Sequence, residues 1–546
     1  MLCSCSADFY HEKADLETQA VLFGKTDCVD NVEDESLDIS SPQEWDKSEL
    51  KKRPAGSLKF LGEYANEERG ARLMSLDKAL ETGITYNRSY LAQKESVFLT
   101  ALDLTLAQHR LSPIFGGGGD VTRQSDSRRA AAGLTDLVAT NTFARDQEAN
   151  FDMLLKTGAR LSTDFTQDFL NFMSGSRDIN NSSLAVTLIQ PLLKGGGTKA
   201  TLEALTQADR DVLYSLRDFA NFRRNFIVDL VGDYYSVLQA RDNAFNAYLA
   251  YEGFLKNVER EEALKDEARR TLTQLGQLQQ ALLLSESRWL TSIRTYETRL
   301  DQFKLTLGIP VEENIVLDDK ELDYLKIERV GISKDEAIKI ALVCRPDIET
   351  SRDRIDDAGR RIEVAKNGLK AGLDIRVDYE TISEPGDRTP DLNFDRRNIS
   401  SNLDLDLPLD RKSERNIYRS SLITKELRER QHEENVDKVR LQIYDDWRAL
   451  ELARKNYEIA LKGVALAQLR LDEQNLLFEL GNGEARDLVD AQNDLVNAQN
   501  QRISTLIDHT LARLRLWRDL GILYIKPDGS WIEKLEKESA FARKLR

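Results

Sequence analysis

The sequence predicts a mainly α-helical fold with a small β part, built from long antiparallel coiled-coil helices and four strands per chain. Three observations predict it: two very long helical patterns, four short segments of strict alternation, and an internal repeat that presents the same order of elements twice. Helices of that length cannot fold back into one compact core, so they must pack against neighbouring helices. We therefore expect one elongated unit used twice rather than several globular domains.

The longest helical pattern runs from Lys412 to Glu479 without a proline, and residues 198–268 repeat the design in the first half. Apolar residues recur along both at spacings of three, four or seven, which is typical of a packed helix. At about 1.5 Å per residue the longer helix would measure roughly 100 Å. A plain structural coiled coil is the alternative interpretation, and the helices alone do not exclude it.

The four alternating segments place apolar and polar side chains on opposite faces of a strand. Their apolar positions are Leu161, Phe165 and Phe169; Leu184, Val186, Leu188 and Leu192; Ile375, Val377 and Tyr379; and Leu403, Leu405 and Leu407. One face must meet an apolar medium and the other must meet water. Two surface hairpins of a soluble sheet would satisfy this pattern. Four strands from each of three copies, closed into a twelve-stranded membrane barrel, would satisfy it without leaving an open edge.

The internal repeat sets the domain boundaries. Ser75–Leu80 recurs as Ser333–Ile338, and Leu307–Ile309 recurs as Leu520–Ile522. The helix starts are 258 positions apart but the strand-closing prolines, Pro191 and Pro408, only 217, so the first half carries roughly forty extra residues. We expect an N-terminal polar extension (1–72), a first repeat (73–310) with an insertion at about 113–150, a linker (311–332), a second repeat (333–523) and a C-terminal tail (524–546).

Composition and motifs exclude several function classes. The 93 acidic residues outnumber 77 lysines and arginines, giving a net charge of −16, which argues against a general nucleic-acid binder. Four histidines and four cysteines lie too far apart for a metal site. The glycines at 116–119 lack the Gly-Lys-Ser/Thr of a phosphate loop, so flexible backbone is expected there. No apolar stretch is long enough for a membrane-spanning helix, and no catalytic motif indicates an enzyme.

An ordered set of motifs resembles the outer membrane efflux protein family, the TolC-like channels. No single motif is specific, but the ordered and duplicated set is, and it covers about residues 75–523. The five landmarks are the helix start at Ser75–Leu80 with its copy at Ser333, the strand exit Gln190–Gly196, the turn Arg345–Asp347, the strand Leu403–Pro408, and the tip Leu480–Gly483 followed by Leu488–Gln492.

The resemblance implies a homotrimer in the outer membrane of a Gram-negative-type cell, with most of the chain in the periplasm. Its barrel would contact outer-membrane lipid and continue into a periplasmic α-barrel of long helices. Such channels serve as exit ducts for drugs, metals or proteins when docked to a periplasmic adaptor (a membrane fusion protein) and an inner-membrane transporter. They bind no cofactor or metal and catalyse nothing. A non-membrane coiled-coil scaffold with two hairpins is the alternative.

The resemblance also assigns residues at the helix tips. Asp487 and Asp490 match acids that ring the pore entrance, where symmetry would make a cation-attracting constriction; a solvated acidic helix face is the alternative. The expected adaptor contacts are Leu275, Gly276 and Gln277 at the first tip, and Leu480, Gly481, Asn482 and Gly483 at the second. Gly276 and Gly481 are expected to be turn glycines. Leu282 and Gly483 depart from acidic and basic family positions, so closure would either use other bonds or be weaker.

The N-terminus carries a candidate lipidation site. Residues 2–5 fit the end of a lipoprotein signal, with Ser4 before Cys5, which would then be acylated. A pair of reduced, unmodified thiols at Cys3 and Cys5 is the alternative, and Cys28 and Cys344 are expected to be unpaired. Residues 6–72 are polar and are expected either to wrap the helical body or to remain mobile.

Overall fold

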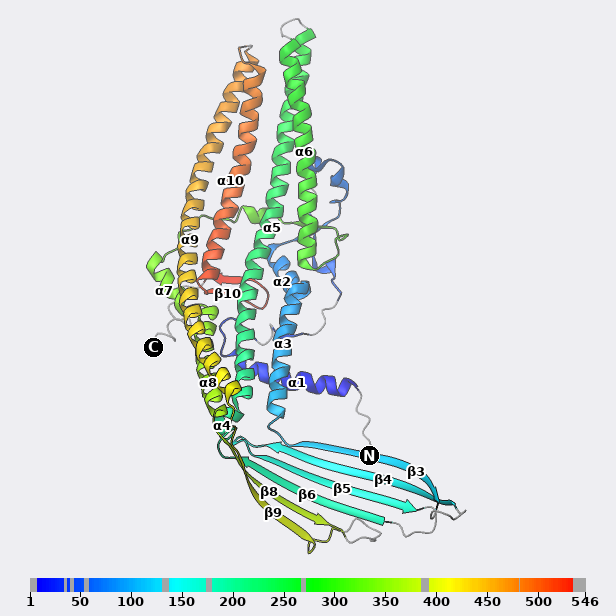
Figure 1. The fold of residues 1–546 in the computed structure, drawn as a ribbon. Coiled ribbons are helices and arrows are strands. Elements are labelled where there is room, and N and C mark those ends of the chain that lie inside the picture. Colours follow the sequence, from blue (N-terminus) through cyan, green and yellow to red (C-terminus); the bar gives the residue numbers. More distant parts are fainter. Residues whose placement is uncertain are drawn as a thin grey trace. The chain divides into compact units, whose positions relative to one another are not determined.

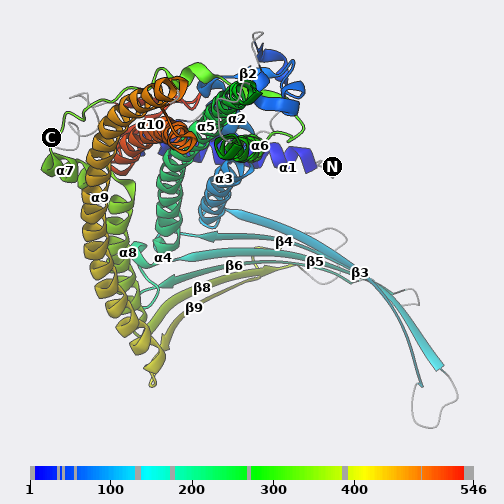
Figure 2. The same ribbon diagram turned by 90° about the horizontal axis from the view of Figure 1, so that it is seen from above.

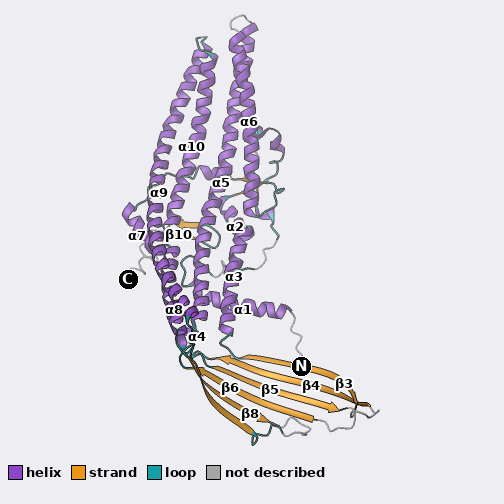
Figure 3. Ribbon diagram, viewed as in Figure 1, coloured by secondary structure: helices purple, strands orange, loops and turns teal. Residues whose placement is uncertain are grey.

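The computed structural model describes residues 7–33, 37–39, 44–53, 58–129, 137–172, 179–266, 272–383, 392–480 and 482–533. The chain divides into two compact units. The sheet unit comprises Met1–Gly24, Leu99–Tyr214 and Ser351–His432, and the helical unit comprises Lys25–Phe98, Ser215–Thr350 and Glu433–Arg546. As predicted, most of the described chain is helical and a smaller part is sheet (Figures 1 and 3).

One antiparallel sheet of six strands dominates the sheet unit, in the order β3-β4-β5-β6-β8-β9. The strands are β3 (Ile114–Arg129), β4 (Leu137–Leu154), β5 (Arg160–Phe172), β6 (Ile179–Pro191), β8 (Gly372–Ile382) and β9 (Arg397–Asp406). The sheet is curved, and β3 and β4 extend well beyond their neighbours (Figure 2). Since the strand order is linear, the sheet is not closed on itself within the chain.

The strand register places the predicted apolar positions on one face. Leu161 lies opposite Leu188, which lies opposite Val377, and cross-strand partners share a face. The next row toward the outer end joins Thr163, Val186, Tyr379 and Ile399. The opposite face carries acids, among them Asp374 beside Asp404 and Asp146 beside Asp168. The alternation predicted from the sequence is therefore shared by β5, β6, β8 and β9, which lie side by side in the sheet.

The expectation of four strands is wrong, because the insertion at 113–150 forms two more. β3 and β4 pair along their whole length, from Ile114 with Asp152 to Arg129 with Leu137. The glycines at 116–119, expected to be flexible, lie inside β3. Glycine has no side chain to alternate, so a strand that opens with four of them shows no period-two pattern. The sequence therefore showed no alternating pattern from which β3 could be predicted.

Long helices make up most of the helical unit. The helices of the chain are α1 (Ala7–Thr26), α2 (Leu76–Tyr86), α3 (Arg88–His109), α4 (Thr198–Thr201), α5 (Glu203–Asp266), α6 (Leu272–Leu307), α7 (Lys334–Cys344), α8 (Pro346–Gly368), α9 (Lys412–Glu479) and α10 (Ala485–Asp519). The small strands are β1 (Lys51–Lys52), β2 (Arg72–Met74), β7 (Ile315–Leu317), β10 (Leu523–Ile525) and β11 (Trp531–Glu533). None of the described helices is both long and apolar enough to cross a membrane.

The repeated motifs occupy equivalent places in the helical unit. Ser75 caps α2 and Ser333 caps α7, each accepting a hydrogen bond from a backbone N–H three residues on. Gly308 has φ +80° and faces the backbone of Tyr86, just after which α2 ends. Gly521 has φ +78° and faces the backbone of Cys344 at the end of α7 in the same way. In both places a side chain would collide with backbone, so the close approach requires glycine.

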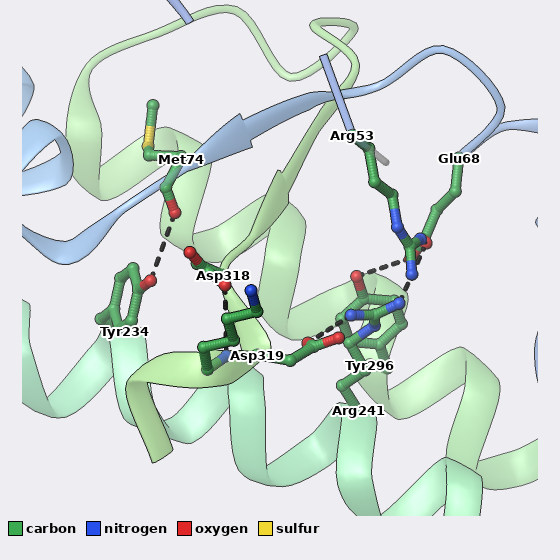
Figure 4. A network of polar contacts seen from close by, with 9 residues as sticks. Arg53, Glu68, Met74, Tyr234, Arg241, Tyr296, Asp318 and Asp319 are labelled. Atoms are coloured by element: carbon green, nitrogen blue, oxygen red, sulfur yellow. Dashed lines mark hydrogen bonds and ion pairs between the residues drawn. The ribbon is translucent and has the colours of Figure 1, made fainter. Parts of the chain in front are cut away.

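A buried ionic network fastens the segment 44–74 to the long helices (Figure 4). Glu68 is 2% exposed and pairs with Arg53 and with Arg241 of α5, the latter at 3.3 Å. Tyr296 of α6 donates a hydrogen bond of 2.8 Å to the same carboxylate. Arg241 also pairs with Asp319. Burial, followed by the charge of Glu68, raises the pKa of Tyr296 well above its usual range, so this phenol stays protonated.

Part of the N-terminal extension therefore packs on the helical unit, which was one of the two expected alternatives. Trp289 of α6 donates a hydrogen bond of 2.6 Å to the carbonyl of Phe60. β1 pairs with β2, which pairs in parallel with β7. The residues before Ala7, including Cys3 and Cys5, lie outside the described residues.

Replacing Glu68 with alanine is expected to lower the thermal-unfolding midpoint of the helical unit. The change leaves the buried Arg241 and the half-buried Arg53 without their shared partner, and breaking a buried ion pair in this way costs about 3–5 kcal/mol. Circular dichroism of the detergent-solubilised protein measures the midpoint. Glu63→Ala, which removes an exposed acid five residues earlier, is the matched control and should leave it unchanged. Equal midpoints for the two variants would contradict the anchoring role of Glu68.

Candidate functional site at the helix tips

The chain reverses between α9 and α10 where the second tip was predicted. α9 ends at Glu479 and α10 begins at Ala485, and Figure 1 shows the two helices joined at this end. Backbone hydrogen bonds of 3.0 Å run from Leu480 to Leu476 and from both Asn482 and Gly483 to Leu477. Gly481 lies outside the described residues.

Gly483 is the residue that the geometry of this tip requires to be glycine. A Cβ added there would lie 2.7 Å from the backbone nitrogen of Phe478 and 2.9 Å from its Cα. Backbone atoms at that distance cannot move aside cheaply, so the reversal is possible only without a side chain. The sequence motif placed Gly483 in the tip but gave the turn role to Gly481.

The expectation that Gly276 is a turn glycine is wrong. Leu275, Gly276 and Gln277 lie within α6, close to its start at Leu272, and nothing lies within 4 Å of a Cβ built on Gly276. Residues 267–271, between the end of α5 and the start of α6, lie outside the described residues. Leu275 and Leu278 are both buried, and this packing outweighs the cost of about 1 kcal/mol for a helical glycine.

All four long helices share one apolar cluster behind the tips. Its buried members come from α5 (Val258), α6 (Leu275, Leu278), α9 (Leu471, Phe478) and α10 (Ala485, Leu488, Ala491, Leu495). An ion pair of 2.9 Å between Arg260 and Glu479 connects α5 to the end of α9. This packing and the ion pair therefore hold the start of α6 and the end of α5 beside the end of α9 and the start of α10.

A groove runs between α6 and α10 beside this cluster. Its lining residues on α6 are Gln277, Gln280, Ala281, Leu284 and Arg288, those on α10 are Arg486, Val489 and Asn493, and Phe254 of α5 forms its floor. Arg288 donates a hydrogen bond of 2.7 Å to Asn493 across it. Leu284 is 52% exposed and gives the groove an apolar side chain that solvent can reach. An amphipathic segment of another protein could bind here through apolar and amide contacts.

Of the predicted contact residues, only Gln277 lines this groove. The sequence analysis placed the first tip at Gly276, whereas most of the groove residues on α6 lie at least one turn further along the helix. No local sequence signal marks the groove, because its lining residues come from α6, α10 and α5, which lie far apart in the sequence.

Asp487 and Asp490 lie on the exposed side of the first turns of α10. Residues three apart on a helix are neighbours, so the two carboxylates share one face, next to the buried stripe that contains Leu488 and Ala491. Arg486 approaches Asp490 at 4.0 Å, which is a weak, exposed ion pair. Both acids stand near a helix N-terminus, where the helix dipole stabilises negative charge.

Further along the helical unit, a carboxyl pair joins α9 to the end of α10. Asp519 is held by Arg518, whose Nε and Nη2 each donate a bond of 2.9 Å, while Arg345 donates to its carbonyl at 3.2 Å. Burial, followed by the negative charge of Asp519, raises the pKa of Asp446 to about 7. Folding thus favours the protonated form of Asp446.

Replacing Gly483 with alanine is expected to destabilise the second tip by about 2 kcal/mol, since the new Cβ meets backbone that cannot yield. Gly276→Ala is the matched control and should stabilise α6 by about 1 kcal/mol, because alanine favours a helix. Hydrogen exchange of residues 474–490 and 272–284 reports both effects. Opposite signs support the assignment, whereas destabilisation by Gly276→Ala would restore Gly276 as the turn residue.

The stability of the helical unit is expected to fall as the pH rises from about 4 to about 7, because of the raised pKa of Asp446 in the folded chain. The unfolded chain releases that proton near the usual carboxyl pKa of 3.8, but the folded chain keeps it to about 7, so stability decreases as the pH rises through this window. Asp446→Asn should remove this decrease and raise the unfolding midpoint at pH 8 more than at pH 5. Asp445→Asn, at an exposed neighbour, should leave the profile intact. Identical profiles for both variants would refute the assignment.

The fold matches solved outer-membrane channels along most of its length. It superposes on the CmeC outer membrane channel of Campylobacter jejuni with a TM-score of 0.61, covering 86% of this chain and 89% of that chain at 13% identity. VceC of Vibrio cholerae gives 0.59, with 82% and 96% covered at 12% identity. The open state of the MtrE channel of Neisseria gonorrhoeae gives 0.58, with 82% and 89% covered at 13% identity.

Comparison of the sequence with known families and proteins finds no relative, whereas comparison of the fold does. A scan against protein-family models finds no match, and no curated protein sequence is similar to this one. Structural matches at sequence identities this low establish the fold alone. They confirm the resemblance that the ordered motifs indicated. The chain therefore has the TolC-like fold of outer membrane efflux channels.

Proposed function

We propose that this protein is the outer-membrane channel, or exit duct, of a tripartite efflux or type I secretion system. It would pass substrates from an inner-membrane transporter and a periplasmic adaptor to the outside. The observation that carries the proposal is the combination of a TolC-like fold with four neighbouring strands, β5, β6, β8 and β9, whose apolar side chains share one face of the sheet. Strands that cross a membrane as a barrel wall need such a face toward the lipid.

The open sheet supports assembly from several copies. Its terminal strands, β3 and β9, each have a strand neighbour on one side only. Unpaired backbone groups cannot face lipid, so a sheet that crosses the outer membrane must close with other copies. A homotrimer is the assembly that the resemblance implies. The apolar face would then contact lipid and the acidic face would line the lumen.

The helix tips would lie at the periplasmic end and carry docking and gating. The groove between α6 and α10 offers exposed leucine and amide groups for the adaptor, and the turn at Leu480–Gly483 lies beside it. Around a threefold axis, Asp487 and Asp490 would bring like charges together at a narrow entrance and so attract cations. With Gly483 in place of a basic residue, closure would depend on the apolar cluster behind the tips.

We also propose that Cys5 is acylated, which would add a lipid anchor to the protein. Mass spectrometry of the mature amino terminus tests it, and a free Cys5 thiol would remove the anchor from the account.

Fractionation separates the channel from a coiled-coil scaffold. A channel should sediment with the outer membrane and migrate in mild detergent as a trimer that heating converts to monomer. A monomer or dimer in the soluble fraction would favour the scaffold and overturn the proposal.

Replacing Asp487 and Asp490 together with alanine is expected to shift the cation-to-anion permeability ratio toward unity. The change removes carboxylates from the narrowest part of the proposed entrance, where their field acts on every passing ion. Single-channel recording in planar bilayers measures the ratio. Asp472→Ala with Glu473→Ala removes the same charge from an exposed face of α9 and serves as the control. Unchanged selectivity and conductance in the first variant would exclude both residues from the constriction.

A further inference from the structure

We propose that the edge of the sheet from which the helices leave forms a basic collar that binds the phosphate headgroups of anionic phospholipids in the inner leaflet of the outer membrane. The collar comprises residues 155–159, 192–199, 369–371 and 407–413, which are the four loops at this edge with the first two residues of α4 and of α9. The inference rests on the proposed channel function and adds a lipid ligand to it.

The strand register brings the four loops into one row. β4 ends beside the start of β5, with Leu154 opposite Arg160, and β8 starts beside the end of β9, with Gly372 opposite Asp406. The last residue of β6 lies opposite Asp374, near the start of β8. Neighbouring strands lie about 5 Å apart, so the loops follow one another along one edge, where α4 and α8 meet the sheet (Figure 1).

Hydrogen bonds fix these loops to one another. The Gly197 N–H donates a bond of 3.0 Å to the carbonyl of Thr157, and the Lys194 N–H donates one of 3.2 Å to the carbonyl of Ala371. The guanidinium of Arg411 donates a bond of 2.7 Å to another carbonyl of the loop 369–371. The loops therefore form one platform, and a ligand bound by several of their side chains meets a preorganised site.

The collar is basic although the chain is acidic. It contains six basic residues and one acidic residue, Asp410, whereas the whole chain has a net charge of −16. Lys194 pairs with Glu414 at 3.5 Å, and within the described chain the other five contact no carboxylate at ion-pair distance. Exposed cations that no acid neutralises attract phosphate groups. The six exposed basic residues are Lys156, Lys194, Lys199, Lys370, Arg411 and Lys412.

Exposed leucines lie directly beside these cations. Leu192 and Leu193 immediately precede Lys194, and their exposed fractions are 46% and 38%. Leu407 and the fully exposed Leu409 precede the basic pair at the start of α9. A leucine next to a lysine or arginine suits the boundary of a bilayer, because the apolar side chain can enter the acyl region while the cation reaches the phosphates.

A second copy of this chain is the competing occupant of the collar. Its own collar would bring six further cations to the contact, and like charges that face each other repel. A phospholipid with a net negative charge offers the complementary sign together with an apolar tail for the leucines. The charge of the collar therefore favours anionic lipid over a contact between collars.

Native mass spectrometry of the full-length protein in mild detergent tests the inference by counting bound lipids. With phosphatidylglycerol and phosphatidylcholine added in equal amounts, the unaltered protein should retain the anionic lipid preferentially. Replacing Lys156, Lys194, Lys370 and Lys412 together with glutamine should weaken this preference by at least about tenfold, because the attraction accumulates with each basic group near the headgroups. Arg411 is kept, since it joins two of the loops.

Replacing Lys326, Lys438, Lys455 and Lys462 with glutamine is the matched control, because it removes the same charge from exposed positions outside the collar. This variant should keep the preference. Equal preferences in the two variants would overturn the inference, and so would an unaltered protein that does not distinguish the two lipids. Inorganic phosphate at the concentration of the lipid should not displace it; complete displacement would show a site for free phosphate and refute binding to a lipid surface.

Fluorescence quenching tests the leucines without altering the cations. A bimane label is attached to Leu409→Cys, or to Leu452→Cys on an exposed face of α9, after the four native cysteines are replaced by serine. In vesicles of brominated phosphatidylcholine, the label at position 409 should be quenched and the label at position 452 should not. A heat-sensitive, conducting trimer without quenching at position 409 would overturn the inference and leave the channel function intact. Protein that neither trimerises nor conducts would instead refute the proposed function.

Discussion

The separation of apolar and acidic side chains across the sheet is the constraint on which the rest of the structure depends. The apolar positions of β5, β6 and β8 line up across the sheet, as in the row of Leu161, Leu188 and Val377, although these strands lie far apart in the sequence. A slip of one residue in any strand would turn its whole apolar set toward the wrong face. The alternation therefore fixes the register, and the register fixes where the helices α3, α5, α8 and α9 connect to the strands.

Glycines allow close approaches between backbone segments in both halves of the chain. Gly308 and Gly521 let the ends of α6 and α10 approach the ends of α2 and α7, while Gly483 allows the reversal between α9 and α10. In each case backbone lies where a side chain would be. These close approaches, with the ionic network around Glu68 and the apolar cluster behind the tips, hold the long helices in defined places. The helices thus need no single globular core.

Sequence reasoning found those features whose residues carry a periodic or paired signal. The long helices, the alternating strands β5, β6, β8 and β9, and the caps at Ser75 and Ser333 all have one. It missed β3 because four glycines carry no alternation, and it misplaced the first tip because one glycine was read as a turn while Leu275 and Leu278 keep α6 helical. The groove at Leu284 and Arg288 joins two helices distant in sequence, which no local pattern reveals.

Site-directed spin labelling along β6 in lipid vesicles tests the central claim, that one face of the sheet meets lipid and the other water. Labels at Leu184, Val186 and Leu188 should be accessible to oxygen dissolved in the bilayer, and labels at Ala185 and Thr187 to a water-soluble nickel chelate. The accessibility should alternate with a period of two residues. Uniform access of the nickel chelate to all five positions, in protein with intact secondary structure, would contradict the account.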